Sequence, residues 1–185
     1  MRASTSRVSE SADPVGFIVA LLVRFPEIAT LVSHPGERTL TISFAVAKRL
    51  DRATQREVRD LLLEHVRSLS ALTAEPPERL EVTCETDDAM TFVRLIRDVR
   101  TITREELQML TALVTQRFDG ILLKSPLAED EAIDDDPAAQ DDAVEFALDA
   151  LRDPSQQKSL VGYREEKRVM VYFVSARKKA KARGR

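Results

Sequence analysis

Hydrophobic and polar residues alternate along two stretches of the chain. In residues 39–46 every second position is apolar, at Leu40, Ile42, Phe44 and Val46. A period of two is typical of a strand with one face in a core. Residues 80–85 alternate in the same way. In residues 91–99 the density of β-branched residues favours a third strand, and a helix with a three-residue repeat is the alternative.

Apolar residues spaced by three and four predict two helices between these strands. Asp51 can cap the first helix, which continues to about Leu72. The capping box Thr103-x-x-Glu106 opens the second helix, and Gly120 is well placed to end it. Both helices therefore have their own start signals in the sequence.

Residues 121–125, ILLKS, are predicted to form a fourth strand. The order from residue 38 to residue 125 is then βαββαβ, which is typical of ferredoxin-like two-layer sandwiches. The strand at 91–99 is apolar on both sides, so something besides the two crossover helices must cover the sheet.

Three further elements are predicted outside this order. Asp13 and Pro14 start an apolar helix, and Pro26 either kinks it or begins a second short helix. A helix over 138–152 precedes a β-hairpin whose turn is Glu165-Glu166-Lys167. We expect the N-terminal helix or the helix at 138–152 to cover the rest of the sheet.

The predicted fold class is α+β: a ferredoxin-like βαββαβ two-layer sandwich with an added N-terminal helix and a C-terminal helix plus β-hairpin. The predicted organisation is a disordered N-terminus (1–12), an α+β core domain (13–124), an acidic linker (125–137), a C-terminal helix and β-hairpin packing on the core (138–176), and a basic disordered tail (177–185).

Charge is strongly segregated along the 185 residues, although the formal net charge is only −3. Residues 1–124 carry a net −1, residues 125–158 a net −9 and residues 159–185 a net +7. Flexible basic segments bind phosphates by neutralising charge and releasing counterions, so the tail is a candidate polyanion contact. Its charged residues are Arg177, Lys178, Lys179, Lys181, Arg183 and Arg185. The alternatives are a solubilising end or a partner for the acidic linker.

A secondary basic face is predicted at the start of the first crossover helix. It consists of Lys48, Arg49, Arg52, Arg56 and Arg59. Acidic residues are interleaved with it, so an ordinary solvated face is the favoured interpretation.

Several kinds of site are disfavoured by the sequence, and no catalytic residue, metal site or cofactor is predicted. The acidic stretch 129–142 lacks the glycine of a calcium-binding loop, and the glycines of the chain are too scattered for a phosphate-binding loop. Cys84 lies on the inward face of its strand, away from a histidine in a turn (His34) and one on an apolar helix stripe (His65). An RNA-recognition sheet would need more aromatic residues than Phe92.

We expect a cytoplasmic protein, because a single cysteine argues for a reducing compartment and residues 15–23 are too short a run to span a membrane. The leading prediction is a non-enzymatic binding protein that contacts RNA or a ribonucleoprotein through its basic tail. A protein-interaction or regulatory module, with a protein partner or a second copy, is the alternative. An enzyme built on Asp98 with Arg94 or Arg97 is the third hypothesis.

Overall fold

The computed structural model describes residues 14–73, 75–124, 137–165 and 168–174. The predicted N-terminal disordered segment, nearly all of the acidic linker and the basic tail therefore lie outside the described residues.

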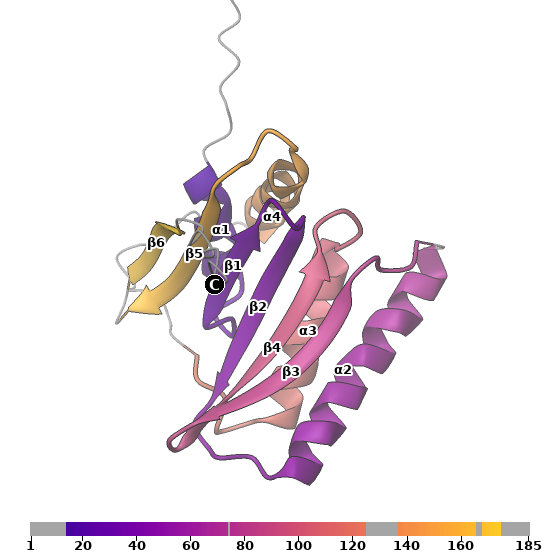
Figure 1. The fold of residues 1–185 in the computed structure, drawn as a ribbon, viewed down its shortest axis with the longest axis vertical. Coiled ribbons are helices and arrows are strands. Elements are labelled where there is room, and N and C mark those ends of the chain that lie inside the picture. Colours follow the sequence, from indigo (N-terminus) through magenta and orange to yellow (C-terminus); the bar gives the residue numbers. More distant parts are fainter. Residues whose placement is uncertain (1–13, 74, 125–136, 166–167, 175–185) are drawn as a thin grey trace, which may run out of the picture.

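The strands of the described residues form one antiparallel sheet in the order β3-β4-β2-β1-β5-β6 (Figure 1). The strands are β1 (Thr30–His34), β2 (Thr39–Val46), β3 (Leu80–Asp87), β4 (Met90–Asp98), β5 (Ser159–Glu165) and β6 (Arg168–Val174). Residues 91–99 are thus mainly a strand, as predicted, and the C-terminal hairpin extends the sheet by pairing β5 with β1.

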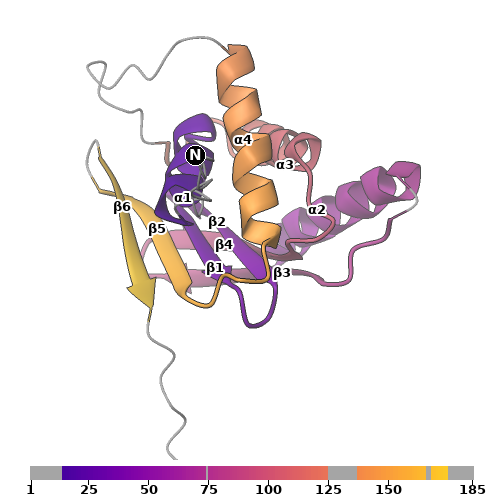
Figure 2. The same cartoon turned by 90° about the horizontal axis from the view of Figure 1, so that it is seen from above.

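All four described helices lie on one face of this sheet (Figure 2). They are α1 (Pro14–Arg24), α2 (Arg52–Thr73), α3 (Arg104–Arg117) and α4 (Pro137–Arg152). α2 packs beside β3, and α1 packs against α4 and the C-terminal hairpin. The core between the layers is built mainly from aliphatic residues and includes the inward row Leu40, Ile42, Phe44 and Val46.

The predicted start and stop signals of the crossover helices are confirmed. The Asp51 carboxylate accepts a 2.7 Å hydrogen bond from the Thr54 N–H at the start of α2. Thr103 Oγ1 accepts one of 3.2 Å from the Glu106 N–H at the start of α3. Gly120, with φ of +74°, follows the end of α3.

The predicted fourth strand is wrong, and the ferredoxin-like topology is not confirmed. The ILLKS segment makes only an isolated bridge, between Leu122 and Val46. The carbonyl of Ala45, just before Val46, accepts a hydrogen bond from the Leu123 N–H. The carbonyl of Ser43 accepts one from the Ala29 N–H. Both carbonyls point to the same edge of β2, because residues two apart in a strand face the same way. β1 already occupies most of that edge, so the strand order differs from a simple ferredoxin-like sandwich while the α+β class holds.

Two expectations for the N-terminal half are also corrected. The chain does not continue as a helix after Pro26: α1 ends at Arg24 and β1 begins at Thr30. Neither α1 nor α4 covers the second face of the sheet, because both lie on the same side as α2 and α3 (Figure 2). One face of the sheet is therefore left open by the described helices.

Candidate functional site

The open face of the sheet gathers side chains from strands that are distant in the sequence. The strand registers align the row Ile96, Thr41, Val32, Val161 and Tyr172, and beside it the row Arg94, Ser43, Thr30, Tyr163 and Met170. Small side chains occupy β1 and β2, whereas larger ones lie on β4, β5 and β6. The face is therefore a mixed apolar and polar surface with aromatic groups toward its flanks.

Three aromatic side chains belong to this open face. Phe92 lies on β4 and is half-buried. Tyr163 and Tyr172 come from the C-terminal hairpin, and their rings stack with centroids 5.8 Å apart and planes inclined by 17°. Tyr172 remains 46% exposed. Of these three residues only Phe92 could be assigned to a sheet face from the sequence, because the pairing of β5 with β1 joins segments more than a hundred residues apart and has no local signal.

Charges on the open face have both signs. Arg94 pairs with Glu85 at 2.5 Å, and both side chains are substantially exposed. Arg168 begins β6 at the hairpin side of the face. Val174 ends that strand three residues before Arg177, the first charge of the basic tail. The hairpin side of the face is thus the part of the described chain from which the tail continues.

The predicted secondary basic face is divided by the structure. Arg52, Arg56 and Arg59 line an open groove of about 410 Å³ between α2 and β3, together with Gln55, Val82, Thr83 and Cys84. Lys48 and Arg49 lie in the exposed loop before α2 and are not part of the groove. The acidic residues interleaved with these arginines on α2 do not line the groove, so its charged lining consists of guanidinium groups.

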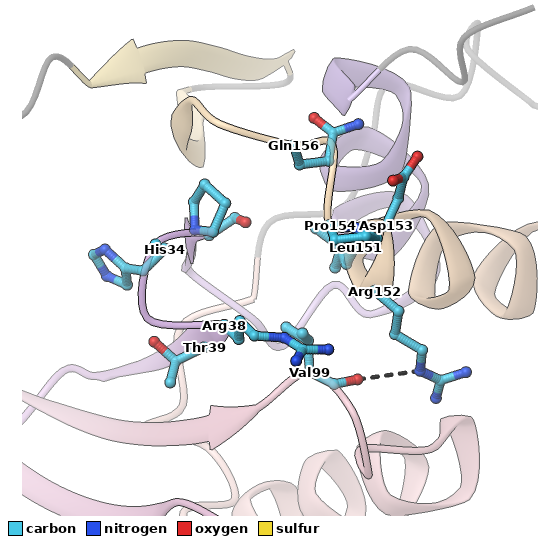
Figure 3. Close-up of a pocket in the computed structure, with 12 residues that line it drawn as sticks. His34, Arg38, Thr39, Val99, Leu151, Arg152, Asp153, Pro154 and Gln156 are labelled. Atoms are coloured by element: carbon cyan, nitrogen blue, oxygen red, sulfur yellow. Dashed lines mark hydrogen bonds between the residues drawn. The ribbon is translucent and has the colours of Figure 1, made fainter.

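A smaller pocket of about 190 Å³ lies where the β1–β2 turn meets the end of α4 (Figure 3). Arg152 in its wall is already engaged: it donates hydrogen bonds of 3.1 and 2.7 Å to the carbonyls of Val99 and Ile102. Asp153 in the same wall accepts a hydrogen bond from the Ser155 N–H, which lowers the pKa of that carboxyl. Among the described residues that line the pocket, no hydrogen bond joins a nucleophile to a base.

The residues of the enzyme hypothesis form a buried structural network instead. Arg97 is fully buried and donates hydrogen bonds of 2.8 and 3.0 Å to the two carboxylate oxygens of Glu106. It also donates to Asp98 and to the Thr101 hydroxyl. Arg94, three residues earlier on the strand, projects from the opposite face. Every member of the network is satisfied, and it ties the end of β4 to the first turn of α3.

The pKa values of the two acids of this network shift in opposite directions. Burial raises the pKa of Glu106, and the guanidinium of Arg97 offsets only part of that rise. Burial also acts to raise the pKa of Asp98, but hydrogen bonds from Thr101 and the Arg79 N–H outweigh it, so this pKa is lowered. The capping box predicted Glu106 correctly as a helix-start residue, but its side chain serves Arg97 rather than the helix terminus.

No Cys–His pair forms among the described residues. Cys84 is half-buried against α2, and burial raises the pKa of its thiol, which disfavours the reactive thiolate. His65 contacts the Leu61 carbonyl within its own helix at 2.8 Å, and His34 lines the small pocket of Figure 3.

The described residues also contain no cluster of three or more metal-ligating side chains. Asp141, from the acidic stretch 129–142, instead forms a 3.0 Å ion pair with Arg24. Within the same part of the chain, every helix is too short or too polar to span a bilayer.

Comparison of the chain with protein-family models, with curated proteins and with solved structures finds no match. The geometry defines an α+β protein with one helix-covered and one open sheet face.

Proposed function

We propose that this chain is a non-enzymatic RNA-binding protein that holds single-stranded RNA on the open face of its sheet and with its basic tail. The observation that carries the proposal is that Phe92 on β4 and the stacked pair Tyr163 and Tyr172 on the hairpin all project to the face that the described helices leave open. Aromatic side chains on an open sheet provide stacking platforms for unpaired bases.

The open sheet face and the basic tail would make different contributions to one binding surface, which supports the proposal. The charged side chains that the strands project to the open face are more often acidic than basic, so this face would supply base stacking rather than attraction for phosphates. The six tail charges continue from β6, the strand that carries Tyr172. Phosphate neutralisation by the tail and stacking on the sheet would then act on neighbouring nucleotides of one strand.

The test is fluorescence anisotropy of a labelled single-stranded RNA over a salt series. Tyr172→Ala should weaken binding by about 1–3 kcal/mol, the range for loss of one stacked base. The matched control is Phe173→Ala, because Phe173 has similar exposure, 54%, on the same strand but points to the other face of the sheet. Equal effects of the two substitutions would reject the sheet-face site.

A second variant tests the tail separately. A chain ending at Ala176 lacks all six tail charges. If each neutralises one phosphate, the slope of log affinity against log salt should become less steep by about 4, from about 0.7 per phosphate on single strands. An unchanged slope would make the tail a solubilising segment.

The second candidate function is binding of a protein partner or a second copy on the same open face. It is favoured by half-buried aliphatic residues in the middle of the face, Val32, Ile96 and Val161. This function predicts a mass that rises with concentration in sedimentation equilibrium and that Val161→Glu returns to the monomer value. A mass that stays at the monomer value at every concentration would contradict self-association on this face.

A further inference from the structure

β3 is an edge strand of the sheet that the described residues form, and one side of its backbone has no partner within that part of the chain. Among the described strands β3 pairs with β4 alone, and the Asp98 N–H donates to the Arg79 carbonyl across that pair. Arg79 therefore faces β4, as do the residues at even steps from it, because the hydrogen-bonding direction alternates along a strand. The N–H and C=O groups of Leu80, Val82, Cys84 and Thr86 point outward. None of them has a hydrogen-bond partner among the described residues.

The outward edge of β3 opens onto the groove lined by Arg52, Arg56 and Arg59. These arginines are spaced by four and three residues on α2, so they lie along one flank of the helix. Arg59 pairs with Asp60, whereas Arg52 and Arg56 make no ion pair with any described residue. A free strand edge and unpaired guanidinium groups thus face the same space.

We propose that this groove binds an extended segment of a partner protein, which adds to the sheet as a strand beside β3 and carries acidic residues at alternate positions. The partner's backbone pairs with the outward groups of Val82 and Cys84, and its carboxylates meet the arginines of α2. The site is separate from the open sheet face, so this inference does not depend on RNA binding.

The alternation follows from the geometry of pairing. Residues opposite one another in neighbouring strands project to the same face of the sheet. Val82 and Cys84 project toward α2, so the partner residues opposite them do the same. Such residues are about 6.7 Å apart along the added strand, close to the rise of about 6 Å between Arg52 and Arg56 on the helix.

The intervening partner residues meet a different surface. They lie beside Glu81, Thr83 and Glu85, which project to the open face. Acidic residues are disfavoured there by like-charge repulsion, and hydroxyl or basic side chains fit. The charges of β3 and α2 together specify an acidic residue at every second position rather than a continuous acidic run. A phosphate chain, charged at every step, fits this edge less well.

The probe is a synthetic peptide as long as β3, eight residues, in which Glu alternates with Thr. Its binding to the full chain is measured by fluorescence anisotropy at low salt. Arg56→Glu should weaken binding by about tenfold or more, since it removes a charge-assisted contact and adds repulsion. Arg168→Glu makes the same charge change at an exposed position of β6, at the opposite edge of the sheet, and should leave the affinity unchanged.

Two N-methylated versions of the peptide separate strand addition from simple charge attraction. Methylation of the amides that face β3 should abolish binding, whereas methylation of the other set should retain it, because only one set donates to the sheet. Equal binding by both peptides would overturn the proposal. So would equal effects of Arg56→Glu and Arg168→Glu, or displacement of the peptide by single-stranded RNA with the same dependence on Arg56.

Discussion

Arg97 is the largest fully buried side chain of the described structure, and it is charged. Removing a guanidinium from water is costly, and a buried charge is tolerated only where its hydrogen bonds and charges are matched. Glu106, Asp98 and Thr101 supply that match from the end of β4 and the start of α3. The network therefore fixes the angle at which the chain leaves the sheet and enters the helix.

Arg97→Ala is expected to lower the free energy of unfolding by about 3–5 kcal/mol, because it leaves two buried carboxylates without their cation. Arg94→Ala is the control on the same strand. Its exposed pair with Glu85 contributes at most about 1 kcal/mol. Urea unfolding followed by circular dichroism measures both, and similar losses would show that the Arg97 network contributes no more than a surface pair.

Asp98 predicts how stability changes in acid. Its folded pKa is lowered, so its contribution is fully present above the unfolded pKa of about 3.9 and is lost as the pH falls through the folded value. Glu106 has a raised pKa, so its pH dependence runs the other way: its contribution to stability is lost as the pH rises through its folded pKa. Comparison with Asp98→Asn isolates the first effect: the variant should lose less stability than the native chain on acidification below about pH 4. Parallel pH profiles would contradict this.

Among the elements, the packing of α1 on β5 depends on a glycine. A Cβ at Gly162 would collide with Cγ2 of Ile18 and come within 3.0 Å of Leu22 Cδ1 on the same helix. The absence of a side chain at this position lets the helix lie close to the strand, which helps bury the apolar face of α1.

Gly162→Ala should therefore destabilise the protein by about 1–3 kcal/mol through overpacking. Gly36→Ala is the matched control, because a Cβ at Gly36 meets nothing within 4 Å. Thermal unfolding compares the two variants. A wild-type melting temperature for Gly162→Ala would mean that α1 shifts away from β5 at little cost.

The sequence predicted elements whose signals are local and missed those that depend on distant pairing. Alternation in β2 and the caps Asp51 and Thr103 are local, and the predicted elements formed. β1 has five residues and no clear alternation, so it was not predicted. Its position excludes ILLKS from most of the edge of β2, which is why that apolar run did not become a strand.

The candidate sites also combine features with a local sequence signal and features that depend on distant pairing. Arg52, Arg56 and Arg59 were predicted as a helix face from their spacing, but the groove beside them requires the position of the β3 edge. The placement of Phe92 and the hairpin tyrosines on the same face could not be predicted, because it depends on the order of strands in the whole sheet.

At the scale of the molecule, one sheet joins the two ends of the described chain. β1 pairs with β2 on one side and with β5 on the other, so the hairpin and the β2–β4 region share backbone hydrogen bonds. The natural probes lie near opposite edges: both tyrosines are in the hairpin and the single cysteine is on β3.

A cooperative sheet predicts that these probes report one transition. Tyrosine fluorescence and the reactivity of Cys84 toward a thiol reagent should give the same urea midpoint, as expected for a single two-state unit. An earlier midpoint for tyrosine fluorescence would show that the hairpin unfolds independently.

The central place of β1 also bears on how the chain is made. Thr30 pairs with Tyr163, so the second edge of β1 has no partner until more than 130 further residues have been synthesised. Until then the apolar face of α1, which later packs on β5 and α4, is uncovered as well. Contacts of such sequence separation form late and leave partly built sheets open to aggregation. During synthesis the second edge of β1 and the apolar face of α1 therefore stay uncovered until the C-terminal hairpin has been made.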